Sequence, residues 1–348
     1  MSNPRRVTAD FRFNGKWLGK SLDDYLQSVT YTDVASGTSD QLDIVLQNIE
    51  MDWLGKKYPK KGDRVDGKII FVNWDSILDK KVDCGAFVLD DVGFSGGPLT
   101  AEFGCVAAPI NSSFNTRERT KTYKDVTIEE IAQEIADKYD LELRCSDADI
   151  RIKTIEQSQK TDSAFLYDLC DTYGLSMKVY KKAIVIYDQT VMEEKKTVAK
   201  LTRESFIDDR WEYKDALVGV YTGARISYKP GDGSDEISVY VGEKDEEAKD
   251  ARVLHVNEVA DSISDAYFKA AAAVNKSNQE ATTLSGDIWP DPKICAGVTA
   301  KVSGLGKADG KYFVDKCVTE VGSSRSRQTV EMHKCQERLP RGPEPEEE

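Results

Sequence analysis

The sequence predicts a mainly β protein in which a small α+β domain lies between two β-rich segments. Apolar and polar residues alternate in several segments on both sides of the middle of the chain, as they do in half-buried strands. Residues 123–188 differ, because they contain two short helical patterns with capping residues, each followed by a strand-like run. With 348 residues, the chain is long enough for two or three domains, each with its own core.

The first β domain is expected at residues 1–115. Leu42, Ile44 and Leu46 alternate with polar residues, which is the period of a half-buried strand. Other elements of this domain are expected as strands at 40–50, 68–77 and 85–97 and as a short helix or turn with a polar loop at 52–65. Residues 112–126 lose the apolar pattern, so we expect them to link this domain to the next.

The α+β domain is expected at residues 116–190 and begins with a helix. Thr127 and Glu130 have the spacing of a capping box, in which each side chain bonds the backbone amide of the other residue. One face of the helix then carries the apolar residues Ile128, Ile131, Ile135 and Tyr139. Leu141 and Leu143 follow as a strand, and a charged link leads to the second helix.

The second helix of this domain is marked at both ends. Asp162 is expected to be its N-cap, and Gly174 is placed to follow its C-terminus in the left-handed conformation. Its buried face is expected to contain Phe165, Leu166, Leu169 and Tyr173. Residues 177–188 then form a hairpin with Lys181 and Lys182 at its turn. Helices this short are not stable alone, so both must pack on the strands.

The second β domain is expected at residues 191–336 and contains one helix at 258–280. Its four consecutive alanines, Ala270–Ala273, suit close packing on a sheet or a neighbouring backbone. Paired strands are expected at 216–230 and 234–244, and three or four more strands after the helix, with a hairpin at Gly304–Gly310. Residues 337–348 are rich in Pro and Glu and are expected to be a disordered acidic tail.

The composition argues against several classes of protein. The net charge of −13 disfavours nucleic-acid binding, because such proteins need Lys and Arg to displace the counterions of phosphates. No apolar run approaches the roughly 18–20 residues that span a bilayer. The first residues also lack the apolar core of a secretory signal, so we expect synthesis and folding in the cytosol.

The placement of Cys and His disfavours metal, disulfide and nucleophilic sites. The seven cysteines contain no C-x-x-C pair, so reduced and mostly buried thiols are expected. His255 and His333 are the two histidines, and neither is accompanied by a recognised nucleophile motif, so we expect ordinary strand residues. His333 and Cys335 could supply two metal ligands, but no second pair completes a site. No catalytic, cofactor-binding or metal-binding residue is therefore expected.

Acidic and basic clusters are the remaining candidates for chemistry. Adjacent acidic side chains diverge on a strand or helix, so four pairs are expected to be solvated: Asp23–Asp24, Asp90–Asp91, Glu129–Glu130 and Asp208–Asp209. The segment PGDGSDE at 230–236 lacks the ligand spacing of a calcium loop and is expected to be a hairpin turn. The basic run Arg117–Lys124 is expected to be a solvated linker, with contact to an anionic partner as the alternative.

The α+β region and the C-terminal region carry an ordered set of family motifs. A Thr-initiated helix with a short strand is present as Thr127, Ile131, Ala132, Ile135, Ala136, Leu141 and Leu143. A Q-x-x-x-S/T-D-x-x-F-L-x-x-L-x-x-x-x-G pattern follows as Gln157, Thr161, Asp162, Phe165, Leu166, Leu169 and Gly174. The C-terminal motifs are Ala270–Ala273, Leu284–Gly286, Gly297–Val298, Val302–Gly306 and Gly310–Val314. In this order the motifs resemble the late-control D family, the baseplate hubs of contractile phage tails and of phage-tail-like bacteriocins.

The resemblance implies a structural role in assembly, without catalysis or a cofactor. Hubs of this family are homotrimers in which each subunit has two tube-type, β-barrel-like domains flanking a small α+β domain. Three subunits then form a pseudo-sixfold ring, which meets the hexameric tail tube or a tube initiator on one face and the trimeric spike on the other. Other baseplate proteins are further partners. The chain would be made in the bacterial cytoplasm and released by lysis as part of the assembled particle.

Two other classes of function stay open on the sequence alone. One is a tail-associated cell-wall hydrolase that uses paired carboxylates, and the other is a glycan- or receptor-binding β protein. The resemblance also does not distinguish a phage tail from a bacteriocin or another contractile injection system.

Overall fold

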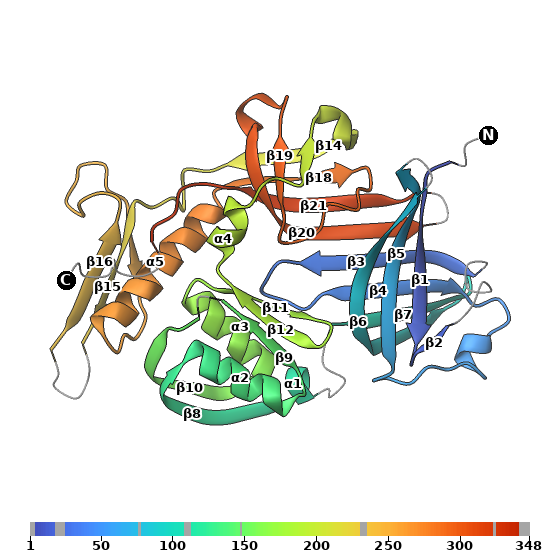
Figure 1. Ribbon diagram of the computed structural model, residues 1–348, viewed down its shortest axis with the longest axis horizontal. Helices are drawn as coiled ribbons and strands as arrows, with labels where there is room; N and C mark the ends of the chain where they lie inside the picture. Colours follow the sequence, from blue (N-terminus) through green and yellow to red (C-terminus); the bar gives the residue numbers. More distant parts are fainter. Residues whose placement is uncertain are drawn as a thin grey trace.

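The computed structural model describes residues 4–17, 25–75, 78–107, 113–146, 148–229, 235–322 and 325–340. It is an elongated molecule with a long sheet, a compact α+β unit beside the middle of that sheet, and a helix with three strands at one end (Figure 1). The prediction of a mainly β fold with an α+β part is therefore confirmed. The predicted division into domains stays a prediction, because the β-rich segments are joined as described below.

The long sheet has 13 strands within the described residues and two halves. The first sheet half comprises β1 (Arg6–Phe13), β2 (Lys16–Trp17), β3 (Leu26–Val34), β4 (Gln41–Gln47), β5 (Arg64–Asp75), β6 (Leu78–Ser95) and β7 (Thr100–Val106). The second sheet half comprises β13 (Ala199–Leu201), β14 (Phe206–Asp215), β18 (Thr282–Ile288), β19 (Thr299–Val302), β20 (Gly310–Gly322) and β21 (Arg327–Lys334). Short 3₁₀ turns lie at η1 (Asp52–Leu54), η2 (Arg203–Ser205) and η3 (Gly306–Ala308).

The two halves are joined by backbone hydrogen bonds between β20 and β3. These strands pair antiparallel from Lys316 opposite Val34 to Gly322 opposite Ser28. Each half also has a core of its own, and Val321 of β20 packs into the core of the first half. The strand order β14-β18-β21-β20-β3-β4-β7-β6-β5-β1-β2 follows from this junction.

Several predicted strands and turns of the sheet are confirmed. The alternation at 40–50 is strand β4, whose Leu42, Ile44 and Leu46 are fully buried. The predicted hairpin at Gly304–Gly310 joins β19 to β20, which pair antiparallel. Gly304 has φ +86° and Gly306 has φ +67°, which explains the glycines at this turn.

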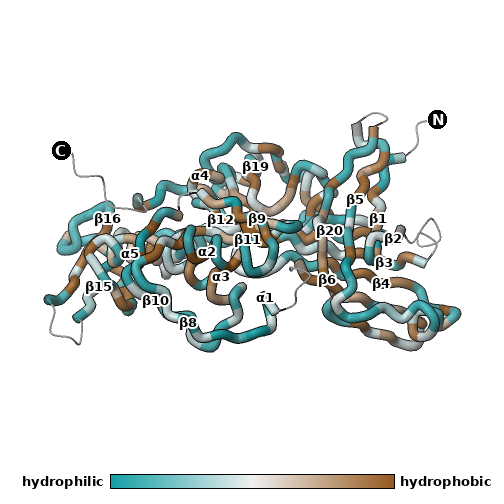
Figure 2. Tube along the Cα trace, turned by 60° about the horizontal axis from the view of Figure 1, so that its bottom comes forward, coloured by the Kyte–Doolittle hydropathy of each residue, from teal (hydrophilic) through white to brown (hydrophobic). Residues whose placement is uncertain are grey.

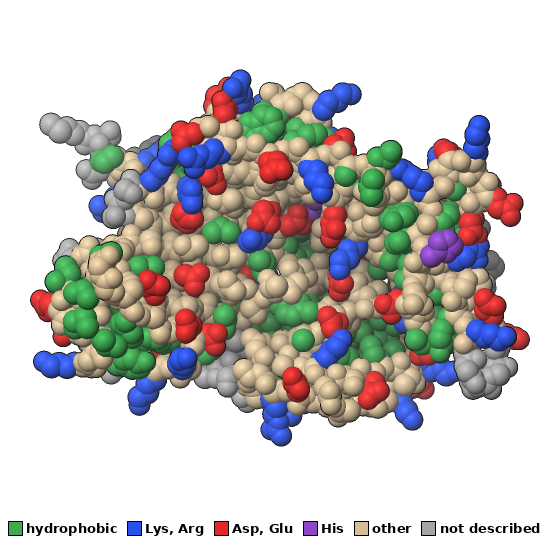
Figure 3. Space-filling model, turned by 180° about the vertical axis from the view of Figure 1, so that it is seen from behind, with side chains coloured by type: hydrophobic (Ala, Val, Ile, Leu, Met, Phe, Trp, Pro, Cys, Tyr) green, Lys and Arg blue, Asp and Glu red, His purple; other side chains and the backbone are tan. Residues whose placement is uncertain are grey.

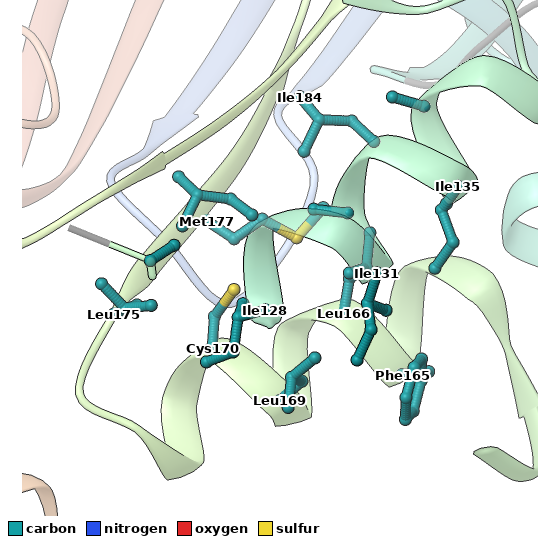
Figure 4. Packing of buried hydrophobic residues seen from close by; sticks show 14 of the residues in the cluster. Ile128, Ile131, Ile135, Phe165, Leu166, Leu169, Cys170, Leu175, Met177 and Ile184 are labelled. Carbon is teal, nitrogen blue, oxygen red and sulfur yellow. The ribbon is translucent and has the colours of Figure 1, made fainter. Parts of the chain in front are cut away.

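The α+β unit (residues 113–187) packs two helices on a three-stranded sheet. It contains α1 (Ser113–Thr116), β8 (Glu118–Thr127), α2 (Ile128–Lys138), β9 (Glu142–Cys145), β10 (Arg151–Thr161), α3 (Asp162–Thr172), β11 (Ser176–Tyr180) and β12 (Ala183–Tyr187). The predicted apolar faces of α2 and α3 meet in one core with Met177 and Ile184 from the hairpin (Figure 4). The capping box of Thr127 and Glu130 is present, and Gly174 has φ +69° just after the C-cap of α3.

Two segments of this unit were predicted to be links, and both predictions are wrong, because each segment contains a strand. The link at 112–126 contains α1 and most of β8, and the charged link before the second helix contains β10. β8 and β10 pair antiparallel with each other, and few of their side chains are buried. Figure 2 shows both in mainly hydrophilic colours beside the apolar helices. The basic run Arg117–Lys124 therefore lies mostly on a strand rather than on a linker.

The predicted cap of the second helix is also wrong by one residue. The N-cap of α3 is Thr161, whose hydroxyl accepts from the amide of Ala164 at 3.2 Å. Asp162 is instead a buried residue of the helix, and its carboxylate accepts from Tyr139 at 2.6 Å and from Gln157 at 2.9 Å. Burial alone would raise the pKa of Asp162, but hydrogen bonds from Lys138, Tyr139 and Gln157 lower it overall.

A separate unit of three strands and a helix forms one end of the molecule. This outer unit comprises β15 (Gly223–Tyr228), β16 (Ile237–Gly242), β17 (Val253–Val256) and α5 (Ile263–Gln279). β15 and β16 pair antiparallel as predicted, whereas residues 216–222 are a loop and 230–234, the predicted turn, lie outside the described residues. The helix begins later than predicted, because Ser262 is its N-cap. The alanines of α5 pack closely on β15 and β16 as expected, with Ala270 and Ala271 fully buried.

The prediction placed the start of a disordered tail at residue 337, which is too early, because residues 337–340 belong to the described structure. Residues 341–348 lie outside the described part, but Leu339 is buried against α5, where its backbone amide donates to Oδ1 of Asn275 and its carbonyl accepts from Nδ2 of Asn275, both at 2.9 Å. Among the helices that the structure describes, none is long and apolar enough to cross a membrane.

Candidate functional site

A large cavity lies where the units of the molecule meet. It has a volume of about 1070 Å³ and is lined by residues of the α+β unit, α4 (Gln189–Glu194), α5, β20 and the C-terminal segment 335–340. At its base lies a group of charged residues, the His333 cluster, which we define as Glu193, Asp315, His333 and Arg338. This cavity is the first place to look for chemistry.

His333 is almost completely buried on β21, with 1% of its surface exposed. Its Nδ1 lies 2.8 Å from both carboxylate oxygens of Asp315, and its Nε2 lies 3.0 Å from Oε1 of Glu193. A carboxylate only accepts hydrogen bonds when ionised, so a ring between two carboxylates is best satisfied with a proton on each nitrogen. Burial lowers the pKa of His333, but the bonds to Asp315 and Glu193 outweigh it and raise the pKa overall.

The two carboxylates of the cluster are also engaged by other groups. Glu193 accepts from the amide of Gln189 at 2.9 Å and forms an ion pair with Arg338. Burial would raise the pKa of Glu193, but its bonds to His333 and the charge of Arg338 lower it overall. A general acid needs a raised pKa, so Glu193 has the wrong protonation state for that role. The arrangement is that of a charge-balanced joint between elements.

The acidic pairs considered in the sequence do not assemble into an acid–base site either. Asp90, Asp91, Glu129 and Glu130 are exposed, and Glu130 is used in the capping box of α2. Asp208 and Asp209 are exposed on β14 and form ion pairs with Arg325 and Arg203, respectively. Asp23 and Asp24 lie outside the described residues.

The described residues contain no cluster of three or more His, Cys, Asp and Glu arranged to hold a metal ion. Both histidines lie on strands as expected, His255 exposed on β17 and His333 in the cluster. Both ring nitrogens of His333 face carboxylates, so neither is directed to a site shared with Cys335. None of the seven cysteines, all of which lie in the described residues, forms a disulfide.

A second buried group of charges fastens the α+β unit to the first sheet half. We define the Lys178 cluster as Asp33, Asp40 and Lys178. The Lys178 ammonium pairs with Asp33, lies 3.0 Å from Oδ2 of Asp40, and donates to the Val34 carbonyl at 2.9 Å. Asp40 also accepts from the Val34 amide at 3.0 Å. One cation therefore faces two buried carboxylates.

The excess of carboxylates over cations in this cluster affects the pKa values of Asp40 and Lys178. Burial raises the pKa of Asp40 to about 6; Lys178 opposes this rise and Asp33 adds to it. Burial would lower the pKa of Lys178, but the charges of Asp33 and Asp40 raise it well above its usual range. Lys178 is therefore cationic throughout the physiological range, and the raised pKa of Asp40 brings its titration closer to neutral pH.

Further polar contacts around the Lys178 cluster hold the α+β unit in place. The amide of Met177 donates to the Ser36 hydroxyl at 3.0 Å, and the Tyr187 hydroxyl donates to the Ala35 carbonyl at 2.8 Å. At the other end of the hairpin, the Tyr180 hydroxyl donates to the Asp83 carbonyl at 2.9 Å. The hairpin β11–β12 thus contacts both the β3–β4 corner and β6.

The outer unit contacts the other side of the α+β unit through its helix. The Tyr173 hydroxyl of α3 donates to Oδ1 of Asp265 at 2.7 Å, and Lys269 lies over the Tyr173 ring at 5.3 Å. Lys276 and Asp171 add an exposed ion pair between the same two helices. The α+β unit is therefore wedged between the long sheet and α5 (Figure 1).

The sequence did not single out any residue of the two clusters except His333. Lys178 lies more than 130 positions from Asp33 and Asp40 in the chain, and nothing in the sequence around these residues marks them as partners. The only sequence signal is weak: Asp33 lies beside strongly apolar stretches where a charge needs a partner. Glu193 had no distinguishing context at all.

Two curated phage proteins are similar to this chain in sequence. The chain is 28% identical over 222 residues to a probable baseplate hub protein of Escherichia phage 186, which covers 62% of this chain and 54% of that protein. It is 29% identical over 214 residues to a probable baseplate hub protein of Escherichia phage P2, which covers 60% of this chain and 52% of that protein. The matched region thus spans about half the length of these curated relatives. No family model matches the chain.

Solved structures extend the likeness to almost the whole chain. A 43 kDa tail protein of prophage MuSo2 from Shewanella oneidensis matches 94% of this chain and 98% of its own, with TM-score 0.68 and 12% identity. A tail protein from Neisseria meningitidis matches 94% and 97%, with TM-score 0.68 and 11% identity. An Escherichia coli component of the type VI secretion system matches 96% and 80%, with TM-score 0.54 and 13% identity. The chain therefore has the fold of phage tail proteins, and its predicted resemblance to baseplate hub proteins is confirmed.

Proposed function

We propose that this chain is a structural baseplate hub of a contractile phage tail or a tail-like particle. The observation that carries the proposal is the combination of sequence identity to probable hub proteins with a tail-protein fold over 94% of the chain. In the proposed role, a homotrimer joins the hexameric tail tube, or a tube initiator, to the trimeric spike, and other baseplate proteins bind around it. The chain is made in the bacterial cytoplasm and leaves the cell by lysis within the particle.

The two sheet halves suit this adaptor role. Each half has its own core, and the β20–β3 ladder holds the halves in one fixed relation. Three copies of such a chain present six sheet halves in a ring, which is the number of positions that a hexameric tube offers. A closed ring also removes the exposed strand edges that a single chain carries at β14 and at the β1–β2 side.

We further propose that the chain acts without catalysis. The strongest candidate for an acid–base pair is Glu193 with Asp315, and both carboxylates are occupied by His333. Arg338 adds a second cation to Glu193, so neither carboxyl group of this pair is free to protonate a leaving group. In this proposal the cluster holds α4 and the C-terminal segment on the sheet.

The trimer is tested by light scattering of the purified protein, alone and with its spike protein. The expected mass is near three times 38.8 kDa, and electron microscopy should show a ring with a central channel. A protein that stays monomeric at high concentration with the spike present would contradict the adaptor proposal. The catalytic rival is tested separately by incubation with peptidoglycan: turnover that is lost in Glu193→Gln or in Asp315→Asn would replace the structural proposal with an enzymatic one.

A further inference from the structure

Two exposed patches at opposite ends of the molecule have complementary chemistry. The basic tip is the loop 48–62 with Leu99 beside it, at the end formed by the first sheet half. The acidic end consists of the loops 216–222 and 243–252 of the outer unit. Figure 1 shows the η1 loop at one end of the long axis and β15 and β16 at the other.

The basic tip presents apolar side chains to solvent in one place. Its exposed large apolar residues are Ile49 (65%), Met51 (43%), Leu54 (46%), Tyr58 (54%) and Leu99 (39%). Figure 3 shows hydrophobic side chains gathered on this end of the molecule. Contiguous exposed apolar surface of this kind marks an interaction site more often than chance.

Hydrogen bonds and aromatic packing hold the basic tip on the sheet, so its surface is formed before a partner binds. The Asn48 amide donates to the Leu99 carbonyl at 2.9 Å, and the Asn48 side chain accepts from the Trp53 amide at 3.2 Å. The ring of Trp53 packs edge-on against Phe103 of β7 at 5.3 Å. A preformed surface binds with less loss of conformational freedom than a loose loop does.

The rim of the tip is basic although the chain as a whole is acidic. Four lysines surround the apolar residues, all of them exposed: Lys56, Lys57, Lys60 and Lys61. Glu50 and Asp52 are the only acidic residues of the loop, and Asp52 is paired with Lys57 at 3.0 Å. The net charge of the chain is −13, so this positive patch favours an acidic partner surface.

The acidic end has the reciprocal composition. Leu217 and Val218 are 75% and 92% exposed, the latter the most exposed large apolar residue in the described part of the chain. The adjoining loop 243–252 has five acidic residues, Glu243, Asp245, Glu246, Glu247 and Asp250, against the three basic residues Lys244, Lys249 and Arg252, so its net charge is −2. Glu246 is paired with Arg225 and Asp250 with Lys244. The two loops are tied together, since the Glu243 amide donates to the Thr222 carbonyl at 3.0 Å and Arg252 donates to the Leu217 carbonyl at 3.4 Å.

We infer that the basic tip of one copy of this chain docks on the acidic end of a second copy. The apolar residues of the two patches would meet at the centre of the contact and the opposite charges at its rim, which is the usual anatomy of a specific interface. Because the two patches are different surfaces, the contact is heterologous, and repeated contacts of this kind close into a ring when the rotation allows it. The number of three copies rests on the proposed function; the pairing of the two patches does not.

Charge reversal on the full chain tests the contact. The tip variant carries Lys56→Glu, Lys60→Glu and Lys61→Glu, and the end variant carries Glu243→Lys, Asp245→Lys and Glu247→Lys. A matched control for the tip variant, with the same change in charge, is made at exposed lysines outside both patches: Lys153→Glu, Lys182→Glu and Lys196→Glu. Circular dichroism of each variant checks that the fold is kept, which exposed positions should allow.

Light scattering and sedimentation give the result. We expect each single variant to self-associate roughly tenfold or more weakly than wild type, because like charges then face each other at the rim. In a mixture, the tip of each variant meets an end of opposite charge on the other variant and an end of like charge on its own kind, so the two variants should associate with each other, in alternation, more strongly than either associates with itself, beginning with pairs near twice 38.8 kDa. A chain that carries both reversals should recover the assembly, and the lysine control should match wild type.

Two outcomes would overturn the inference and are distinguishable from each other. If a trimer forms and neither reversal weakens it, the tip serves another partner, and the proposed hub function is unaffected. If wild type stays monomeric under all conditions, the self-contact and the trimeric part of the proposed function are both lost.

Discussion

The two buried charge clusters do similar work in different ways. The Lys178 cluster fastens the α+β unit to the first sheet half with one cation and two carboxylates. The His333 cluster fastens α4 and the C-terminal segment to the second sheet half with two cations and two carboxylates. The Lys178 cluster depends on a single ammonium group, whereas the His333 cluster depends on an imidazole ring that can lose its proton. Breaking the two clusters should therefore lower the free energy of unfolding by different amounts and over different pH ranges.

Removing the cation of the Lys178 cluster should have the largest effect on stability. In Lys178→Ala, Asp33 and Asp40 stay buried and lose the cation that pairs with them, and breaking a buried pair in this way costs about 3–5 kcal/mol. Urea denaturation should be followed by circular dichroism, which reports the helices, and by tryptophan fluorescence. All five tryptophans lie outside residues 113–187, so fluorescence reports the sheet alone.

We expect the helical signal of Lys178→Ala to be lost at lower urea concentration than the tryptophan signal. The physical reason is that the α+β unit has its own core but loses its main polar anchor. Coincident transitions with no change in midpoint would show that the cluster does not hold the unit.

Breaking the His333 cluster should have a smaller effect, because the cations and carboxylates that remain still pair. In His333→Phe, Glu193 keeps Arg338, whereas Asp315 loses its strongest partner at 2.8 Å. Hydrogen bonds to charged groups contribute about 1.5–3 kcal/mol, but Asp315 is 35% exposed and keeps the Gln279 side chain at 3.3 Å, so the free energy of unfolding should fall by about 1–2 kcal/mol. His255→Phe is the matched control, since His255 is exposed on β17, and it should stay within about 0.5 kcal/mol of wild type.

The His333 effect should also depend on pH. The pKa of His333 is raised above its ordinary value of 6.5, so the folded protein holds a proton that the unfolded chain has released. The stabilisation is therefore fully present below about pH 6.5 and is lost as the pH rises through the raised pKa. Urea midpoints of wild type and His333→Phe should therefore converge as the pH rises from about 6.5 through the raised pKa of His333. A constant difference across that range would mean that His333 does not carry the charge.

An exposed ion pair on the α+β unit should show the smallest effect. Lys160 and Asp168 lie 2.6 Å apart, but about half of each side chain is exposed. Surface pairs contribute little because water and salt screen them, so Lys160→Ala should change the free energy of unfolding by at most about 0.5 kcal/mol. A loss as large as that of Lys178→Ala would show that burial is not what separates the two kinds of pair.

The parts of the fold that follow from local pattern were predicted from the sequence. The helices of the α+β unit were found because their capping residues and apolar spacing act within a few residues, as at Thr127 and Glu130. β8 and β10 were missed because each buries few side chains, Tyr123 and Ile152 among them, so no period-2 pattern shows. Asp162 was misplaced as a cap because its buried partners, Tyr139 and Gln157, come from elsewhere in the unit.

The clusters could not be predicted for a related reason. Lys178 pairs with residues more than 130 positions away, and nothing near it in the chain differs from an exposed strand lysine. The β20–β3 junction is equally invisible, since it pairs strands from opposite ends of the chain. The resemblance to hub proteins supplied the order of the domains but not the sheet that joins them.

That junction gives the molecule a direction of mechanical strength. β3 and β20 both run along the long axis in Figure 1, and seven residue pairs connect them. A pull along that axis loads all of these hydrogen bonds together in shear, whereas a pull across the sheet opens them one after another. The two sheet halves should therefore transmit axial force as one stiff piece and separate most readily by peeling.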